Sequence, residues 1–147
     1  MSAGFLLDTN VLSELMRDTV DAGVLDWFSK NTPSTLCTST VTQAEILTGI
    51  ALLPSGKRRT ALALAAEAMF EQDFDGSCLV FDAAAAKNYA LIVAARTRLG
   101  MPISTEDAQI AAISLANGLT LVTRNAKDFQ SIEGLVQVNP WVSVAAH

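Results

Sequence analysis

Five short apolar runs alternate along this chain with longer segments whose apolar residues have helical spacing. The runs cover residues 4–8, 36–38, 78–81, 119–123 and 135–138. They are continuous rather than alternating in polarity, which is typical of strands buried on both faces. Successive strands separated by helices form a parallel sheet, because a parallel pair needs a crossover connection. The sequence therefore predicts a three-layer α/β domain with a parallel sheet between helices.

The segments between the strands carry the start and stop signals of helices. We expect helices over residues 9–16, 21–30, 40–53, 57–74, 83–99 and 105–117. Thr40 or Thr42 is expected to cap the third helix, Asp82 the fifth and Ser104 the sixth, since these side chains accept hydrogen bonds from the first free N–H groups. Gly76 is expected to end the fourth.

The size and composition suit one domain with its own core. The chain has 147 residues, of which 50% are hydrophobic and 17% charged, and this excludes a disordered chain. No repeat or linker divides it, so we expect a single domain over residues 1–147. The formal net charge of −5 argues, at first sight, against a nucleic-acid binder of the usual basic kind.

The scarcity of histidine and cysteine argues against several kinds of catalytic site. His147 is the only histidine and the last residue, and a terminal side chain is a poor general base or metal ligand. A Ser-His-Asp triad, a Cys-His pair and a zinc site are thus disfavoured. We interpret Cys37 and Cys78 as buried free thiols in a reducing compartment. Neither a signal peptide nor a membrane span is indicated, so we expect a cytoplasmic protein.

Asp8 is the first candidate functional residue, because it follows the first apolar run directly. Ligands of open parallel sheets bind at the carboxyl ends of the strands, which is where Asp8 is predicted to lie. The alternative is that Asp8 only caps the next helix, since Asp followed by Thr and Asn is typical of turns.

Glu45 lies on the predicted helix 40–53, which is apolar almost all round. Such a helix is expected to be buried, and an ionised carboxylate in it is costly unless it has a partner. No basic residue lies one turn away on this helix, so the partner would be an Arg or Lys from elsewhere, or a metal. The alternative places Glu45 on a wetter edge beside Gly49.

Two further carboxylates fall at comparable places later in the chain. Asp107 lies in the first turn of a largely apolar helix, where the helix dipole and a capping box with Ser104 explain it without any function. Asn125 and Asp128 follow the strand 119–123, and the alternative there is an exposed polar loop. Clustered carboxylates repel one another unless a cation joins them. All-oxygen ligands favour Mg²⁺ or Mn²⁺, which can activate water and neutralise a phosphate.

Four segments in a fixed order form a specific pattern. They read LLDTNVLSE at residues 6–14, TQAEILTGI at 42–50, DAQIAA at 107–112 and LVTRNAKDF at 121–129. The pattern resembles the PIN-domain ribonucleases, and within them the VapC/FitB-type toxins of bacterial type II toxin–antitoxin pairs. The resemblance spans nearly the whole chain, and Asn139-Pro140-Trp141 resembles the FitB-like branch in particular.

The resemblance implies a PIN-like fold with a parallel sheet of four or five strands flanked by helices. It implies that Asp8, Glu45 and Asp107 are catalytic residues and metal ligands, with Asp128 as an additional ligand. The family often has an acid where this sequence has Asn125, and this departure puts a second metal ion in doubt. The supporting polar groups would be Thr9, Asn10, Thr123 and Asn125.

The resemblance also implies an activity and partners. The reaction would be hydrolysis of RNA phosphodiesters by an endoribonuclease that uses water activated by Mg²⁺ or Mn²⁺. Family members usually form homodimers, in some cases within larger toxin–antitoxin assemblies. A small antitoxin neutralises them with a C-terminal segment that blocks the acidic site, often through a basic side chain. Promoter DNA would be bound only through the antitoxin, and no membrane is involved.

Basic residues bear on the RNA substrate. Lys57, Arg58 and Arg59 form the only dense basic run and are candidate phosphate contacts; the alternative is an ordinary charged start of a helix. Further candidates are Arg96, Arg98, Arg124 and Lys127. We interpret Trp27 and Phe28 as core or interface residues, because they fit an apolar helical face.

Two other functions compete with the nuclease hypothesis. Asn125 is compatible with a non-catalytic PIN-like binding module. An aspartate-based phosphatase would also place its nucleophile after the first strand, but it usually needs a second Asp where this chain has Asn10. The net charge does not exclude the nuclease, because bound Mg²⁺ would neutralise acids that serve as ligands. The remaining negative field favours a selective nuclease over a non-specific RNA binder.

Overall fold

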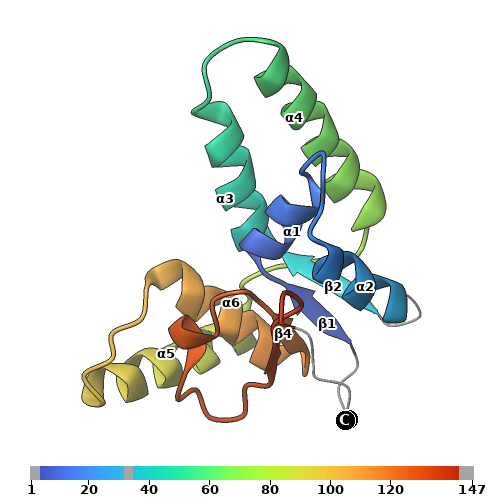
Figure 1. The fold of residues 1–147 in the computed structure, drawn as a ribbon. Helices are drawn as coiled ribbons and strands as arrows, with labels where there is room; N and C mark the ends of the chain where they lie inside the picture. Colours follow the sequence, from blue (N-terminus) through green and yellow to red (C-terminus); the bar gives the residue numbers. More distant parts are fainter. Residues whose placement is uncertain (1–3, 32–34, 143–147) are drawn as a thin grey trace.

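The structure is a computed structural model that describes residues 4–31 and 35–142 (Figure 1). Five parallel strands form one sheet in the order β3-β2-β1-β4-β5. This confirms the predicted α/β class with a parallel sheet. The strands are β1 Phe5–Leu7, β2 Leu36–Ser39, β3 Cys78–Leu79, β4 Thr120–Val122 and β5 Gln137–Val138.

The strand order reverses beside the central strand. The chain runs outward from β1 to β2 and β3, then returns to place β4 on the other side of β1. The two strands are in register from Phe5↔Thr120 to Leu7↔Val122, and the N–H of Asp8 donates to the carbonyl of Val122 at 3.0 Å. Such a switch point is where the crevice of an open parallel sheet opens, at the carboxyl ends of the strands.

Helices cover both faces of the sheet. Leu6 and Leu121 pack on one face in a cluster with residues of α5 and α6. Leu7 and Val122 pack on the other face with residues of α1, α3 and α4, since successive strand residues point to opposite faces. The helices are α1 Thr9–Leu15, α2 Ala22–Lys30, α3 Thr40–Ala51, α4 Lys57–Ala68, α5 Ala83–Arg98 and α6 Thr105–Ala116.

The helix caps are partly as predicted. The carboxylate of Asp82 accepts a hydrogen bond from the N–H of Ala85 at 2.9 Å, and the hydroxyl of Ser104 accepts one from Asp107 at 3.2 Å. The expectation that Thr40 or Thr42 caps α3 is wrong. Ser39 is the cap, because its backbone is still extended and its hydroxyl accepts from the N–H of Thr42 at 3.1 Å.

Two predicted elements are shorter than expected. The helix expected over 57–74 is α-helical only to Ala68 and continues as a π-helical turn, η1 Met69–Asp73, which buries Met69 and Phe70. The strand expected over 78–81 ends at Leu79, because only Thr38 and Ser39 of β2 pair with it. A 3₁₀ turn, η2 Ala126–Phe129, follows β4.

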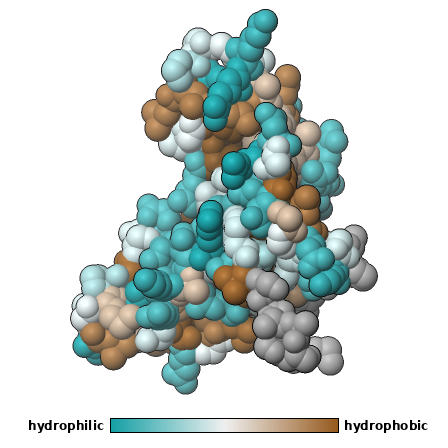
Figure 2. Space-filling model, viewed as in Figure 1, coloured by the Kyte–Doolittle hydropathy of each residue, from teal (hydrophilic) through white to brown (hydrophobic). Residues whose placement is uncertain are grey.

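The prediction that the helix carrying Glu45 is buried is wrong. α3 and α4 extend together away from the sheet (Figure 1), and α3 buries only Thr42, Ile46 and Ile50. Apolar side chains are therefore visible on the surface in this part of the molecule (Figure 2). Leu52 is 81% exposed and Leu64 is 63% exposed. An apolar helix surface indicates that burying this surface would be favourable. It does not indicate that other residues of the same chain pack against it.

Other expectations concern the thiols, the aromatic residues and the membrane. Cys37 is buried on β2 and Cys78 half-buried on β3, both as free thiols. Trp27 packs edge-on against Phe5 and Phe28, each at a centroid distance of 5.0 Å, which confirms a packing role. No helix of the described residues is long and apolar enough to cross a lipid bilayer. His147 lies outside the described residues.

Candidate active site

Asp8 is held at the switch point of the sheet by two hydrogen bonds. Its Oδ2 accepts from the hydroxyl of Thr123 at 2.8 Å, and its Oδ1 accepts from the N–H of Thr9 at 2.7 Å. Thr123 directly follows β4, so the ends of two neighbouring strands meet in this contact. Asp8 is also the N-cap of α1. Asp8 therefore both caps α1 and lies at the carboxyl end of the first strand, as the two alternatives predict.

The environment of Asp8 disfavours its charged form. The pKa of Asp8 is raised from 3.8 to about 6: burial is the largest cause, the negative charges of Asp107 and Glu45 also raise it, and the hydrogen bonds from Thr123 and Thr9 lower it. Asp8 is only 5% exposed. A carboxylate in this setting is best stabilised by a nearby positive charge.

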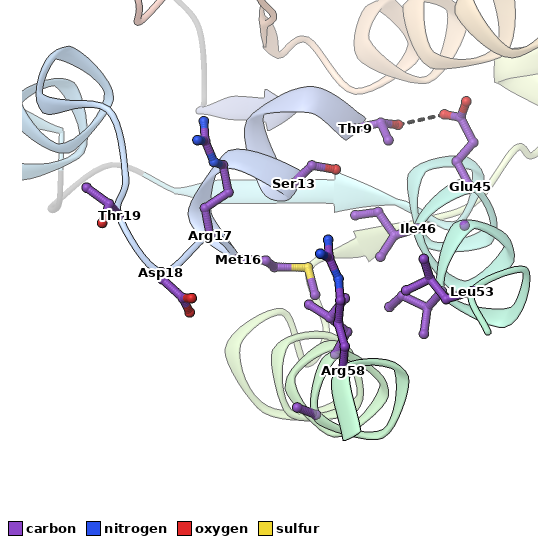
Figure 3. A pocket seen from close by; sticks show the side chains of 14 residues that line it. Thr9, Ser13, Met16, Arg17, Asp18, Thr19, Glu45, Ile46, Leu53 and Arg58 are labelled. Carbon is purple, nitrogen blue, oxygen red and sulfur yellow. Dashed lines mark hydrogen bonds between the residues drawn. The ribbon is translucent and has the colours of Figure 1, made fainter. Parts of the chain in front are cut away.

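Glu45 reaches the same place from α3. Its Oε1 accepts a hydrogen bond from the hydroxyl of Thr9 at 2.6 Å (Figure 3). The same hydroxyl lies 3.1 Å from the hydroxyl of Thr42, which is fully buried. Glu45 itself is exposed, and its hydrogen-bond partner among the described residues is a hydroxyl group rather than the predicted Arg or Lys. The sequence predicts Thr42 only as a possible helix cap, and the structure adds this contact with Thr9.

Asp107 and Asp128 complete the group. Burial raises the pKa of Asp107, a hydrogen bond with Ser104 opposes this, and the negative charges of Asp128, Glu45 and Glu106 raise it further. Asp128 lies in η2 and is exposed. The structure thus brings together four carboxylates from four separate segments, and we call Asp8, Glu45, Asp107 and Asp128 the acidic site.

The acidic site has an all-oxygen donor set without a basic partner. The ion pairs of the described chain join Arg17 to Glu14 and Lys30 to Asp26, away from these four carboxylates. Over residues 4–31 and 35–142, however, no three Asp, Glu, His or Cys side chains are already arranged around one point as metal ligands. The four groups are neighbours whose charges act on one another. Their chemistry fits a hard divalent cation, which accepts oxygen ligands and compensates negative charge.

The predicted supporting residues lie beside Asp8. Thr123 is fully buried, and its hydroxyl also accepts from the N–H of Asn125 at 3.1 Å. The side-chain oxygen of Asn10 accepts from the N–H of Arg124 at 3.4 Å. Arg124 in turn lies with its guanidinium carbon 4.9 Å from the ring centroid of Trp141. The backbone of Arg124 is thus held beside Asn10, and its guanidinium is held against Trp141.

A groove leads away from the acidic site between α1, α3 and α4 (Figure 3). Its volume is about 840 Å³, and Thr9 and Glu45 belong to its lining. Its apolar lining residues include Met16, Ile46, Ile50, Leu53 and Leu62. Arg17 and Arg58 are its basic lining residues. The groove therefore combines an apolar wall, two cations and an acidic end.

The basic residues named from the sequence divide into two groups. Lys57 and Arg58 are exposed at the start of α4, where Arg59 donates to the carbonyl of Leu53 at 3.3 Å. Arg96 is only 4% exposed and bonds to backbone carbonyls, so its interpretation as an RNA contact is wrong. The helical periodicity could have indicated this burial, because Arg96 lies on the same face of α5 as the buried residues Ala85 and Ile92.

Comparison with known proteins gives consistent matches over most of the chain. The PIN domain family matches residues 5–135. The plasmid stability protein StbB of Pseudomonas syringae pv. tomato is 44% identical, over 92% of this chain and 97% of that protein. The VapC ribonuclease Y4jK of Sinorhizobium fredii is 38% identical over 92% and 96%. The toxin FitB of Neisseria gonorrhoeae is 35% identical over 92% and 97%.

A solved structure gives the same picture for the fold. A chain in the structure of FitAB bound to an IR36 DNA fragment superposes with a TM-score of 0.84 and is 32% identical. The match covers 97% of this chain and 99% of that chain. The parallel sheet and its flanking helices are therefore those of a known architecture.

Proposed function

The chain belongs to the PIN domain family, and from this premise we propose that it is the toxin of a VapC/FitB-type toxin–antitoxin pair and a metal-dependent endoribonuclease. The observation that carries the proposal is the acidic site at the carboxyl edge of the sheet, where none of the four carboxylates forms an ion pair with a described residue. We place the activity in the cytoplasm, where RNA is available.

Mg²⁺ or Mn²⁺ is the proposed cofactor. Asp8, Glu45 and Asp107 would hold it, with Asp128 as an additional ligand, because carboxylate oxygens suit hard divalent cations. When bound, such an ion supplies Lewis-acid activation of water and neutralises charge on a phosphodiester. The raised pKa of Asp8, to about 6, supports this assignment, since a nearby cation would favour its ionised form.

The chain's own residues contribute orientation. The hydroxyl of Thr123 and the N–H of Thr9 hold both oxygens of Asp8, and the hydroxyl of Thr9 holds Glu45. Arg124, which follows Thr123 and is held against Trp141, would attract the phosphate backbone of an RNA strand. The acidic site would thus face the scissile phosphate, and Arg124 would face the neighbouring phosphates of the RNA strand.

We further propose that a cognate antitoxin covers the groove beside the acidic site. The solved relatives include complexes of FitAB and FitAcB. An amphipathic segment suits an apolar wall such as Ile46, Ile50 and Leu62, and a basic side chain suits the acidic end at Glu45. Covering the groove in this way blocks access to the acidic site. We propose that promoter DNA is bound through the antitoxin and that the toxin is a homodimer.

The test is cleavage of RNA by the purified chain. Total RNA would be incubated with Mg²⁺, with Mn²⁺ and with EDTA, and the products resolved by sequencing of their ends. We expect internal cuts that need a divalent cation and that fall by at least about 100-fold in Asp107→Asn. Asp26→Asn is the matched control, because Asp26 is an exposed acid on α2 paired with Lys30.

Three results would count against the proposal. Cleavage that survives EDTA would refute the metal dependence. Equal growth arrest on expression of the unsubstituted chain and of Asp107→Ala would refute the acidic site. Tight binding of an antitoxin without cleavage of any RNA tested would favour the non-catalytic binding module to which Asn125 points.

A further inference from the structure

We infer that Arg96 is a positioning residue of the acidic site, because its buried guanidinium joins the segment that leads to Asp107 to the segment that carries Asp128. The inference rests on the proposed function, since it concerns how two proposed metal ligands are held at a common place. Arg96 itself does not touch the carboxylates; it acts through the backbone of both segments.

Within the described residues, the hydrogen bonds of the Arg96 side chain go to backbone carbonyls. Its Nε donates to the carbonyl of Met101 at 2.7 Å, and its Nη1 donates to the carbonyls of Asp128 at 2.9 Å and Gln130 at 3.0 Å. No acid of the described chain forms an ion pair with it. A buried cation is costly unless hydrogen bonds satisfy it. Moving any of the three carbonyls away from the guanidinium would therefore be unfavourable, and this holds the carbonyls in place.

The first of these carbonyls belongs to the connection between α5 and α6. Met101 lies three residues before Ser104, whose hydroxyl accepts from the N–H of Asp107 and so caps α6. The backbone that Arg96 fastens at Met101 therefore leads directly into the first turn of α6. That turn presents the carboxylate of Asp107.

The other two carbonyls belong to η2 and the residue after it. The carbonyl of Asp128 is bonded directly, so the residue whose carboxylate faces the acidic site is held at its own main chain. The negative charge of Asp128 contributes to the raised pKa of Asp107, so the two carboxylates lie within electrostatic range of each other. One side chain thus bonds to both segments, in addition to the packing of Phe129 among the buried residues of α6.

Arginine suits this task better than lysine. Its planar fork directs several N–H groups at fixed angles, whereas the lysine ammonium is a compact charge whose three N–H donors rotate on a flexible stem. Arg96→Lys would keep the charge and lose part of the three-carbonyl arrangement. Arg96→Met would remove the charge and all three hydrogen bonds while keeping much of the side-chain volume.

The experiment measures metal binding and local opening rather than cleavage. Mn²⁺ binding is followed by titration calorimetry on the unsubstituted chain, Arg96→Met and Arg96→Lys, at a temperature where circular dichroism shows each to be folded. Hydrogen exchange of peptides covering residues 99–107 and 125–131 is followed without metal. Lys87→Met is the matched control, because Lys87 is an exposed cation on the same helix.

We expect the Kd for Mn²⁺ to rise about 10- to 100-fold in Arg96→Met, as is typical when the partners that orient metal ligands are removed. Arg96→Lys should fall between this variant and the unsubstituted chain. Exchange should become faster in both peptides in Arg96→Met, and Lys87→Met should leave both measurements unchanged.

Different results separate the failure of this inference from that of the proposed function. A Kd for Mn²⁺ in Arg96→Met within about twofold of the unsubstituted chain would overturn the positioning role, even if the variant melts at a lower temperature. If Arg96→Met does not fold, the same Kd limit applied to Arg96→Lys decides. If the unsubstituted chain itself binds no Mn²⁺, the proposed metal site is refuted, and the inference falls with it.

Discussion

Removing the charge of Asp8 should stabilise the metal-free protein at neutral pH. Asp8 is 5% exposed, and burial together with the charges of Asp107 and Glu45 raises its pKa from 3.8 to about 6. The folded state therefore favours the protonated form. The stability that this preference contributes is fully present below pH 3.8, and it is lost as the pH rises through about 6.

The size of the effect follows from the two pKa values. At about 1.4 kcal/mol per pKa unit, the interval between 3.8 and about 6 corresponds to about 3 kcal/mol of lost stability above pH 7. Asn is a neutral analogue of protonated Asp. In Asp8→Asn the amide oxygen can still accept from the N–H of Thr9, and the amide N–H can donate to the hydroxyl of Thr123. We expect a gain of about 1–3 kcal/mol, because the fit of the amide is not perfect.

The assay is urea unfolding of the unsubstituted chain and Asp8→Asn in EDTA, at several pH values from about 4.5 to 8. The stability advantage of Asp8→Asn should grow with pH and level off above about pH 7. A gain of 2 kcal/mol corresponds to an increase in Tm of about 4–8 °C for a chain of this length. Adding Mn²⁺ should shrink the advantage, since a ligand that binds the folded state stabilises the unsubstituted chain.

Asp26→Asn serves as the control, because Asp26 is an exposed acid that forms an ion pair with Lys30 on the surface. Its stability difference should stay within about 0.5 kcal/mol of zero at every pH. An Asp8→Asn variant that is equally stable or less stable than the unsubstituted chain at pH 8 would refute the argument. So would an advantage that does not change with pH.

Three further substitutions test other parts of the structure. Thr9→Val removes the hydroxyl that holds Glu45 at 2.6 Å, so RNA cleavage should fall about tenfold while Tm changes little; unchanged cleavage in a kinetic assay would contradict this. Arg124→Gln removes the cation held over Trp141, so KM for RNA should rise and its salt dependence weaken by about one phosphate contact. Phe129→Ala empties a core position that is 2% exposed, and urea unfolding should show a loss of about 3–5 kcal/mol.

Several elements of the fold could be predicted from the sequence because short-range interactions determine them. The strand before Asp8 is a buried apolar run, and Asp82 and Ser104 cap the helices that follow them. Each of these features depends on residues a few positions apart. The same holds for the place of Asp8 at a strand end, which follows from the chain order of strand and turn.

The surroundings of Glu45 and Arg96 could not be predicted in the same way. The apolar surface of α3 suggested burial, yet Glu45 is exposed and bonded to Thr9, because α3 and α4 extend from the sheet. Arg96 looked like one of several surface cations, yet it is buried against carbonyls more than thirty residues away. Helical periodicity shows which residues share a face, but not which neighbour that face meets.

The sequence by itself determined the parallel α/β class, the alternation of strands and helices, and the residue types available for chemistry, since apolar patterning and composition are local properties. Only the tertiary structure decided that β4 pairs with β1, so that Thr123 bonds to Asp8 across 115 positions of the chain. The spacing of the four carboxylates, and the pKa of Asp8 that results from it, depend on that pairing. Long-range contacts of this kind depend on the packing of the whole domain. They cannot be inferred from the sequence of any single segment.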